Sequence, residues 1–129
     1  MSCPACGGPV AAVTIPERYR DHHPEAPAVG AVCRRCLTVS GTDAEATDGR
    51  IHEFSEALPN DGEAAIGICV LCTLCVSIAL NRARIEAVVA TLERDGIDAL
   101  STVERLARDD EVALAFDVDR RRPQLEQIL

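Results

Sequence analysis

The chain has 129 residues, a length that fits one domain or two very small ones. Hydrophobic residues make up 47% of it but aromatic residues only 2%, namely Tyr19, Phe54 and Phe116. A core must therefore rest on alanine, valine, leucine and isoleucine, which contribute less per buried residue. The formal net charge of −8 argues against a general nucleic-acid-binding protein, because such a protein needs a basic face to displace phosphate counterions.

The charged residues have an unusual make-up. All 13 basic residues are arginine, and lysine is absent. This acidic, lysine-free and alanine-rich composition resembles that of proteins from extremely halophilic archaea. At molar salt the screening length is about 3 Å, so excess carboxylates repel one another only weakly. A haloarchaeal source is expected, and an acidic protein from a GC-rich bacterium is the alternative.

Two Cys-x-x-Cys pairs, Cys3/Cys6 and Cys33/Cys36, carry the strongest functional signal. Four thiolates complete the tetrahedral set of a structural zinc ion, and the two-residue spacing turns both sulfurs of a pair toward one ion. An N-terminal segment of about 50 residues with few large apolar side chains also needs a cross-link such as a bound metal ion in order to fold. The sequence therefore predicts one structural zinc ion held by Cys3, Cys6, Cys33 and Cys36.

Other chemistry of these cysteines is less favoured. A catalytic zinc keeps one position open for water, and four thiolates leave none. An iron ion in a rubredoxin-like site, or a metal-free redox pair, stays an alternative, although rubredoxin-like sites usually have aromatic packing that this chain nearly lacks. Seven cysteines, an odd number, and a start at Met1 without signal-peptide features both favour a reducing cytosol over a disulfide framework. We expect a cytoplasmic protein.

Residues 1–58 are predicted to form a zinc ribbon with a proline-rich insertion. Gly7 and Gly8 supply left-handed backbone freedom after the first pair. The 26 residues between Cys6 and Cys33 exceed the usual spacing of about 15–20, and the insertion accounts for the excess. The expected elements in chain order are a strand at 10–15, a helical turn at 18–22, a strand at 37–39, an acidic loop at 40–50 and a last strand at 51–54.

Residues 59–129 are predicted to form a bundle of three to four helices, so that the chain as a whole is an α+β protein. Asn60, with Glu63 three residues later, is typical of a helix start. An apolar run follows at 64–80, and Asn81 is only a weak break between it and the next helix. The next helix has an apolar face at Ile85, Val88, Val89 and Leu92 and ends at Gly96. A further helix, capped by Asp98 or Ser101, has its apolar face at Leu100, Val103, Leu106 and Ala107. The last helix starts near Asp117 or Asp119, with Pro123 in its first turn, and presents Leu125, Ile128 and Leu129.

The apolar run 64–80 contains Cys69, Cys72 and Cys75. Its 17 residues would cover about 25 Å as a helix, short of the roughly 30 Å of a bilayer core, which favours a central helix over a membrane span. The cysteine spacing resembles part of a four-iron cluster motif. No glycine or proline lies between these cysteines, and the fourth cysteine and its proline are missing. Core filler is therefore predicted, with a cluster or second metal as the alternative.

Arg120–Arg122 lies where the last helix should begin. A cation in a first turn is unfavourable by about 0.3–1 kcal/mol in low salt. Pairing with nearby carboxylates is expected to offset this cost, the candidates being Asp117, Asp119 and residues 109–111. The alternative is contact with an anion or a nucleic-acid backbone, joined by Arg34 and Arg35.

The remaining polar residues suggest no enzyme. His22 and His23 are expected to be solvated loop residues, because four thiolates already complete the metal site, and His52 stands alone. We find no Ser/His/Asp arrangement, no phosphate-binding glycine loop and no paired carboxylates with catalytic placement.

Four sequence features together resemble a known family. They are an opening Cys-Pro-x-Cys-Gly, a second Cys-x-x-Cys, Ala-Leu-Asn-Arg at 79–82 and Gln-Leu-Glu-Gln at 124–127. The chain resembles an uncharacterised haloarchaeal zinc-ribbon family, a resemblance that implies no assigned activity. We expect a non-enzymatic interaction or adaptor module with a structural zinc and an unidentified protein partner. A nucleic-acid-associated ribbon in transcription or translation is the alternative, followed by a redox or iron–sulfur protein.

Overall fold

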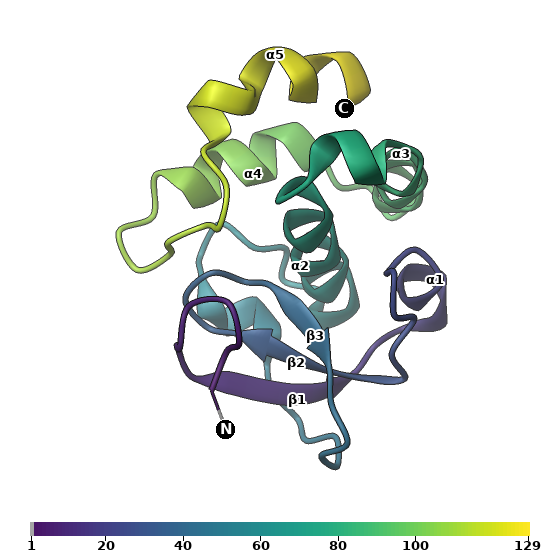
Figure 1. The fold of residues 1–129 in the computed structure, drawn as a ribbon, viewed down its shortest axis with the longest axis vertical. Helices are drawn as coiled ribbons and strands as arrows, with labels where there is room; N and C mark the ends of the chain where they lie inside the picture. The colour runs from purple at the N-terminus through teal and green to yellow at the C-terminus, as the bar shows by residue number, and fades with distance from the viewer. Residues whose placement is uncertain (1) are drawn as a thin grey trace.

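A computed structural model describes residues 2–129 and shows a small sheet at one end with helices packed against and above it (Figure 1). The sheet is antiparallel, in the order β1-β2-β3. Val10 of β1 pairs with Cys33 of β2, and Val32 of β2 pairs with Val39 of β3. The predicted α+β class is confirmed. The strands are β1 Val10–Thr14, β2 Val29–Cys33 and β3 Val39–Gly41.

Two expectations for the N-terminal half change. The third strand starts at Val39 rather than Leu37, because Leu37 has a φ of 63° and belongs to the turn before it. Residues 51–54, expected as a strand, form a 3-10 helix, η1 (Ile51–Phe54). Ile51 and Phe54 are both buried, and this three-residue spacing suits a 3-10 helix, whereas a strand would turn them to opposite faces.

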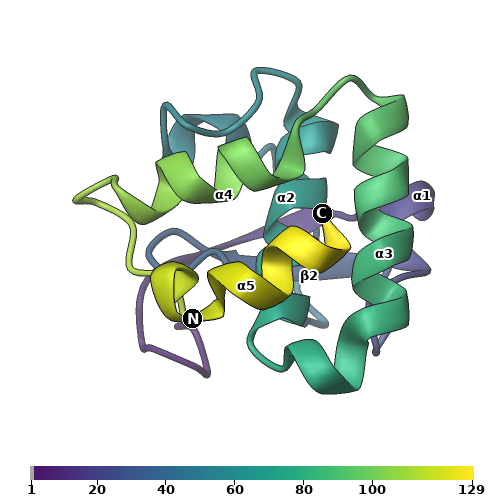
Figure 2. The ribbon, with the colours of Figure 1, turned by 90° about the horizontal axis from the view of Figure 1, so that it is seen from above.

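The helical turn expected near residues 18–22 is α1 (Glu17–Arg20). The longer helices occupy the second half of the chain. α2 is buried along nearly its whole length at the centre of the molecule, while α5 bridges α3 and α4 on the side away from the sheet (Figures 1 and 2). Their bounds are α2 Gly62–Cys75, α3 Ile78–Arg94, α4 Ala99–Ala107 and α5 Val118–Ile128.

The apolar run 64–80 is divided between two helices. The chain turns at Val76 and Ser77, not at Asn81. The Asn81 side chain instead donates a hydrogen bond of 3.1 Å to the carbonyl oxygen of Leu74 at the end of α2, which also accepts from the Ser77 N–H at 3.2 Å. Asn81 therefore stabilises the corner between the helices.

Aspartates cap the starts of α2, α4 and α5. Asp61, rather than the expected Asn60, accepts a hydrogen bond from the Glu63 N–H at the start of α2. Asp98 caps α4 and Asp117 caps α5; each is one of the two residues expected at that helix start. These side-chain oxygens satisfy N–H groups that have no partner within the helix.

Pro123 is the sixth residue of α5, which starts at Val118, so its expected place in the first turn is wrong. At this position proline removes the hydrogen bond to the Asp119 carbonyl. Leu125, two residues later, is fully buried, so packing of the next turn holds α5 in place.

One hydrophobic cluster runs through both halves of the chain. It joins strand residues such as Val13 and Val32 to helix residues such as Ile68, Leu71 and Leu106. The division of the chain at residue 58 stays a prediction, and the core crosses it. Among residues 2–129, no helix is both long and apolar enough to span a bilayer.

Candidate metal centre

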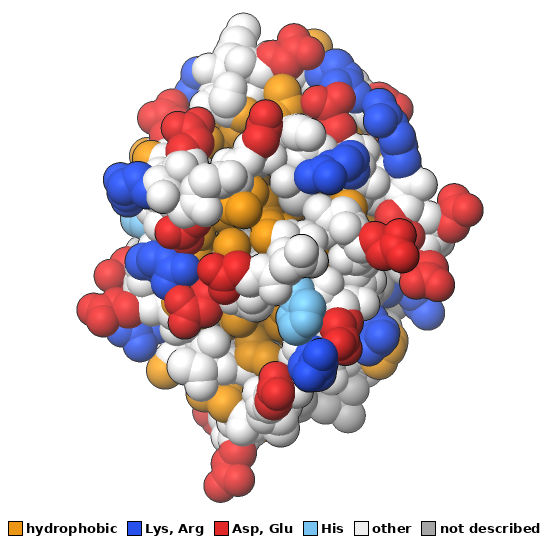
Figure 3. Space-filling model, turned by 180° about the vertical axis from the view of Figure 1, so that it is seen from behind, with side chains coloured by type: hydrophobic (Ala, Val, Ile, Leu, Met, Phe, Trp, Pro, Cys, Tyr) orange, Lys and Arg blue, Asp and Glu red, His pale blue; other side chains and the backbone are white. Residues whose placement is uncertain are grey.

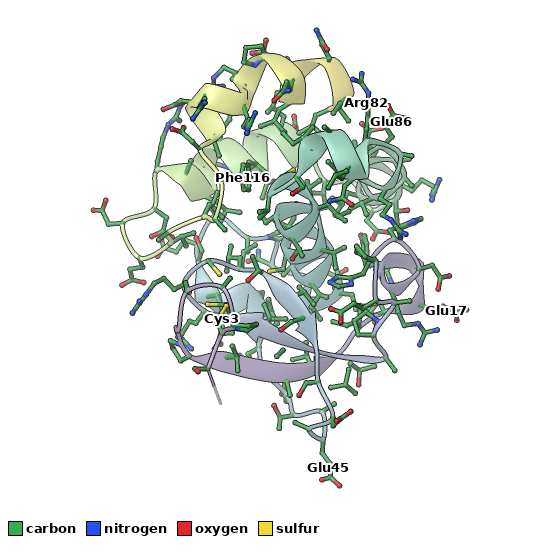
Figure 4. All side chains as sticks on the ribbon, in the orientation of Figure 1. Cys3, Glu17, Glu45, Arg82, Glu86 and Phe116 are labelled. Atoms are coloured by element: carbon green, nitrogen blue, oxygen red, sulfur yellow. The ribbon has the colours of Figure 1, made fainter. Side chains whose placement is uncertain are left out.

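Four cysteine sulfurs meet at one end of the sheet. The Sγ atoms of Cys3, Cys6, Cys33 and Cys36 all lie within 4.8 Å of one another, and sulfur atoms are seen gathered around Cys3 in Figure 4. Cys3 and Cys36 are 3.7 Å apart, and Cys6 and Cys33 are 3.4 Å apart. A zinc ion with sulfurs at about 2.3 Å requires tetrahedron edges of about 3.8 Å. The four sulfurs are thus already spaced to hold a metal ion.

The two Cys-x-x-Cys segments have the same backbone geometry. In the first, the Gly7 N–H donates to the Cys3 carbonyl at 2.8 Å, and the Cys3 N–H donates to the Gly8 carbonyl at 2.8 Å. In the second, Leu37 donates to Cys33 at 3.0 Å, and Cys33 donates to Thr38 at 3.0 Å. We call residues 3–8 the first knuckle and residues 33–38 the second knuckle.

Equivalent positions of the two knuckles carry different residues. Gly7 and Leu37 both have positive φ, 77° and 63°, a conformation that is strained for leucine. Leu37 is fully buried in the core, which offsets that strain. Leu37 was missed as a turn residue in the sequence, although aligning Cys-Pro-Ala-Cys-Gly-Gly with Cys-Arg-Arg-Cys-Leu-Thr would have indicated it.

Gly8 is needed for space rather than for its backbone angle. A Cβ at this position would lie 3.1 Å from Cys33 Sγ and 3.3 Å from Cys6 Sγ. The expectation of left-handed freedom therefore holds at Gly7, while Gly8 allows the backbone to approach the sulfurs closely.

Hydrogen bonds to the sulfurs are unevenly shared. The Ala5 N–H donates to Cys3 Sγ at 3.4 Å, and the Arg35 N–H donates to Cys33 Sγ at 3.3 Å. The Thr38 hydroxyl lies 3.0 Å from Cys36 Sγ and 3.5 Å from Cys3 Sγ. The Thr38 hydroxyl contact was missed in the sequence, because a threonine two residues after a cysteine has no distinctive spacing.

Three of the four cysteines are buried, and burial disfavours the charged form of a thiol that has no cation beside it. It raises the pKa of Cys36 to about 12 and also raises the pKa of Cys33. At Cys3, burial alone would raise the pKa, but hydrogen bonds, above all from Thr38, outweigh it and lower the pKa to about 6. A divalent cation favours the thiolate form of each ligand. The donor set and its environment fit a thiophilic metal ion such as zinc.

The second knuckle is attached to the helical half of the chain. The Val39 N–H donates to the Thr73 hydroxyl of α2 at 2.7 Å. The Ala113 N–H, in the loop before α5, donates to the Arg35 carbonyl at 2.8 Å. The guanidinium of Arg34 lies 5.0 Å from the centre of the Phe54 ring. Distortion of the knuckle would therefore be transmitted to α2 and to the loop before α5.

The cysteine triplet of α2 is placed differently. Cys69, Cys72 and Cys75 are buried in the hydrophobic core, and burial raises the pKa of each thiol, to about 12 for Cys75. Among residues 2–129, the knuckle cysteines form the only group of three or more side chains close enough to hold a metal ion. Their burial agrees with the prediction of core filler.

The arginine cluster at the start of α5 is partly paired. Arg122 contacts Glu104 at 2.7 Å and Asp119 at 3.0 Å. Asp119 was expected as a partner, and Glu104 of α4 was missed because it is distant in sequence. Arg121 hydrogen-bonds Gln124, and the Asp117 side chain accepts from the Arg120 backbone N–H.

One of the histidines is not a solvated loop residue. His23 is buried, with Nε2 2.8 Å from the Val39 carbonyl and Nδ1 accepting from the Glu25 N–H at 3.0 Å. The expectation of a solvated His23 is wrong because the insertion folds back onto β3. Nδ1 of His52 is buried without a hydrogen-bond partner among residues 2–129.

Comparison with known proteins gives one match. The sequence model of a family described as "Family of unknown function (DUF6276)" matches residues 2–129. No curated protein and no solved structure matches the chain. Since the match covers nearly the whole sequence, the chain belongs to the family of unknown function DUF6276.

Proposed function

We propose that this chain is a small zinc-binding protein with a non-enzymatic role as an interaction or adaptor module. The observation that carries the zinc assignment is the approach of four sulfurs, from two knuckles of equal geometry, to tetrahedral spacing. A bound zinc ion would neutralise the thiolates and tie the start of β1 to the β2–β3 turn. Four protein ligands fill every position, which suits a structural rather than a catalytic ion.

The metal assignment is tested by elemental analysis. The full chain, purified under reducing conditions and without added metal, should contain one zinc ion per chain. The same analysis for iron distinguishes the two metals directly, because a reduced ferrous–thiolate site has little visible colour. Absence of any stoichiometric metal from the native, reduced protein would overturn the assignment.

The role in protein interaction is supported by exposed apolar side chains. Within residues 2–129, the large hydrophobic side chains left exposed are Val76 and Leu80, at 45% and 86%. Both lie at the corner between α2 and α3. Exposed apolar residues near one another favour contact with another protein over a role confined to this chain.

This part of the proposal is tested by quantitative co-purification from native lysate. Wild-type protein and an Ala90→Ser control, which changes another exposed residue of α3, should retain the same stoichiometric partner. Leu80→Ser should lose it. Recovery of the wild-type protein alone, or equal retention by Leu80→Ser, would count against the interaction role.

The nucleic-acid alternative gains no supporting observation. Arg34 contacts Phe54, and Arg122 is paired with two carboxylates. On the face drawn in Figure 3, acidic and basic side chains are interspersed with exposed hydrophobic ones. A nucleic-acid-binding surface would concentrate positive charge instead. Binding of RNA or DNA at low salt that weakens with Arg34→Ala and Arg35→Ala would revive this alternative.

The composition supports a halophilic and cytosolic setting. A net charge of −8 without lysine suits molar salt, and free thiols suit a reducing compartment. Thermal unfolding in increasing potassium chloride tests the first point. A melting temperature that rises into the molar range supports it, and one that falls contradicts it.

A further inference from the structure

The two knuckles expose their second cysteines to different extents. Cys6 and Cys36 occupy equivalent positions, yet Cys36 is only 1% exposed while Cys6 is open to solvent. Cys36 lies in a small buried cluster with Cys3 and Cys33, whereas Cys6 is exposed to solvent. Reagents in solution can therefore approach the metal centre through Cys6.

Hydrogen bonding adds to this difference. Cys3 and Cys33 each accept a backbone N–H, and the Thr38 hydroxyl lies 3.0 Å from Cys36 Sγ. Among residues 2–129, no N–H or O–H donates a hydrogen bond to Cys6 Sγ. Hydrogen bonds withdraw negative charge from a thiolate, so the sulfur without them keeps the most electron density for reaction.

Gly8 keeps Cys6 accessible. It is the counterpart of Thr38, but it has no side chain to cover the sulfur. A Cβ there would meet both Cys6 Sγ and Cys33 Sγ at 3.3 Å or less. A side chain at position 8 could therefore not cover Cys6 as Thr38 covers Cys36, because Gly8 lies too close to the sulfurs.

On these grounds, and resting on the proposed zinc site, we propose that Cys6 is the modification site of the metal centre and that its reactant is a low-molecular-weight disulfide. The Cys6 thiolate attacks one sulfur of the disulfide, a sulfur–sulfur bond forms at Cys6, and one thiolate of the reagent leaves. Cys33 Sγ, 3.4 Å away, then attacks Cys6 Sγ and displaces the second thiolate. Two electrons pass to the reagent and a Cys6–Cys33 disulfide forms, so that a zinc ion bound here would keep only Cys3 and Cys36 as ligands and would be lost.

The first step is tested with iodoacetamide on the zinc-loaded full chain. Its reaction forms a sulfur–carbon bond and releases iodide. At substoichiometric reagent, fragmentation mass spectrometry should find Cys6 labelled about tenfold more than Cys3, Cys33 or Cys36. Zinc release, followed with a chromogenic chelator, should keep pace with this label. Cys69, Cys72 and Cys75 are buried internal controls that should react only after denaturation.

The second step is tested with oxidised glutathione and trypsin. Cleavage after arginine separates Cys33 from Cys36, so the expected product links the N-terminal peptide through Cys6 to residues 21–34. A first disulfide between Cys3 and Cys6, or label starting at another cysteine, would overturn the proposal.

A variant separates reactivity from metal binding. Cys6→His keeps a zinc ligand, because structural sites with three cysteines and one histidine are common. It should retain one zinc ion and release it about tenfold more slowly with either reagent. Equal rates of zinc release from the variant and the wild type would refute the role of Cys6. If the variant does not bind zinc, the distribution of iodoacetamide label over the wild-type cysteines tests the proposal. Zinc-free wild-type protein would instead refute the proposed zinc site itself.

Discussion

The ring of Tyr19, the single tyrosine of the chain, lies against the backbone of Gly67 in the middle of α2. A Cβ at Gly67 would be 2.5 Å from Cε1 and Cζ of that ring. The Tyr19 hydroxyl donates to Asp95 at the end of α3. Tyr19 thus connects the insertion after β1 to two helices, and it is fully buried.

Gly67→Ala should destabilise the protein by about 1–3 kcal/mol, since the added methyl group must displace the Tyr19 ring from a packed core. Gly62→Ala is the matched control in the same helix, because its Cβ would have no neighbour closer than 3.9 Å. The control should show no loss of stability. The free energy of unfolding from denaturant titration measures both, and equal values for the two variants would contradict the packing described.

Tyr19 should ionise only at unusually high pH in the folded protein. Burial, followed by the hydrogen bond to Asp95, raises its pKa far above the ordinary value of about 10. Since folding favours the neutral phenol, this stabilisation is complete below about pH 10 and is lost as pH rises toward the folded pKa.

Absorbance of tyrosinate reports this group alone, because the chain has no second tyrosine and no tryptophan. The folded protein should titrate well above the denatured one. Asp95→Asn should move the midpoint down without restoring the ordinary value, since burial remains. Ionisation of folded wild-type protein near pH 10 would show that Tyr19 is exposed.

Cys36→Ser should abolish stoichiometric zinc binding and lower stability by several kcal/mol, because metal binding and folding of the knuckles are coupled. Cys72→Ala is the control at a buried cysteine outside the centre. It should keep one zinc ion and lose on the order of 1 kcal/mol for the small cavity. Elemental analysis and thermal unfolding separate the two, and loss of zinc from Cys72→Ala would make the α2 cysteines part of a metal site.

Asp61→Ala should destabilise the protein by about 1 kcal/mol, because the Glu63 N–H at the start of α2 loses its acceptor. Asn60→Ala should have a much smaller effect, since the Asn60 side chain makes no hydrogen bond among the described residues. Urea unfolding of the two variants measures the difference. A larger loss for Asn60→Ala would restore the helix start expected from the sequence.

Local patterns were enough to predict several features. The spacing of each Cys-x-x-Cys pair brings two sulfurs together within one turn, so the candidate ligands can be read without knowledge of the fold. Apolar residues three and four apart likewise predicted α3 and α4, with Asp98 at the start of the latter. Such features depend on residues within a few positions of one another, and short-range geometry is nearly independent of the rest of the chain.

Features that depend on distant neighbours could not be read from the sequence. Residues 51–54 are β-prone, but packing of Ile51 and Phe54 against α2 favours a 3-10 helix. His23 is buried only because the insertion returns to Val39. The difference between Cys6 and Cys36 arises in the same way, because equivalent local turns leave Cys6 exposed and Cys36 buried. Long-range packing determines which side of a local motif water reaches, and with it which thiolate is open to reaction.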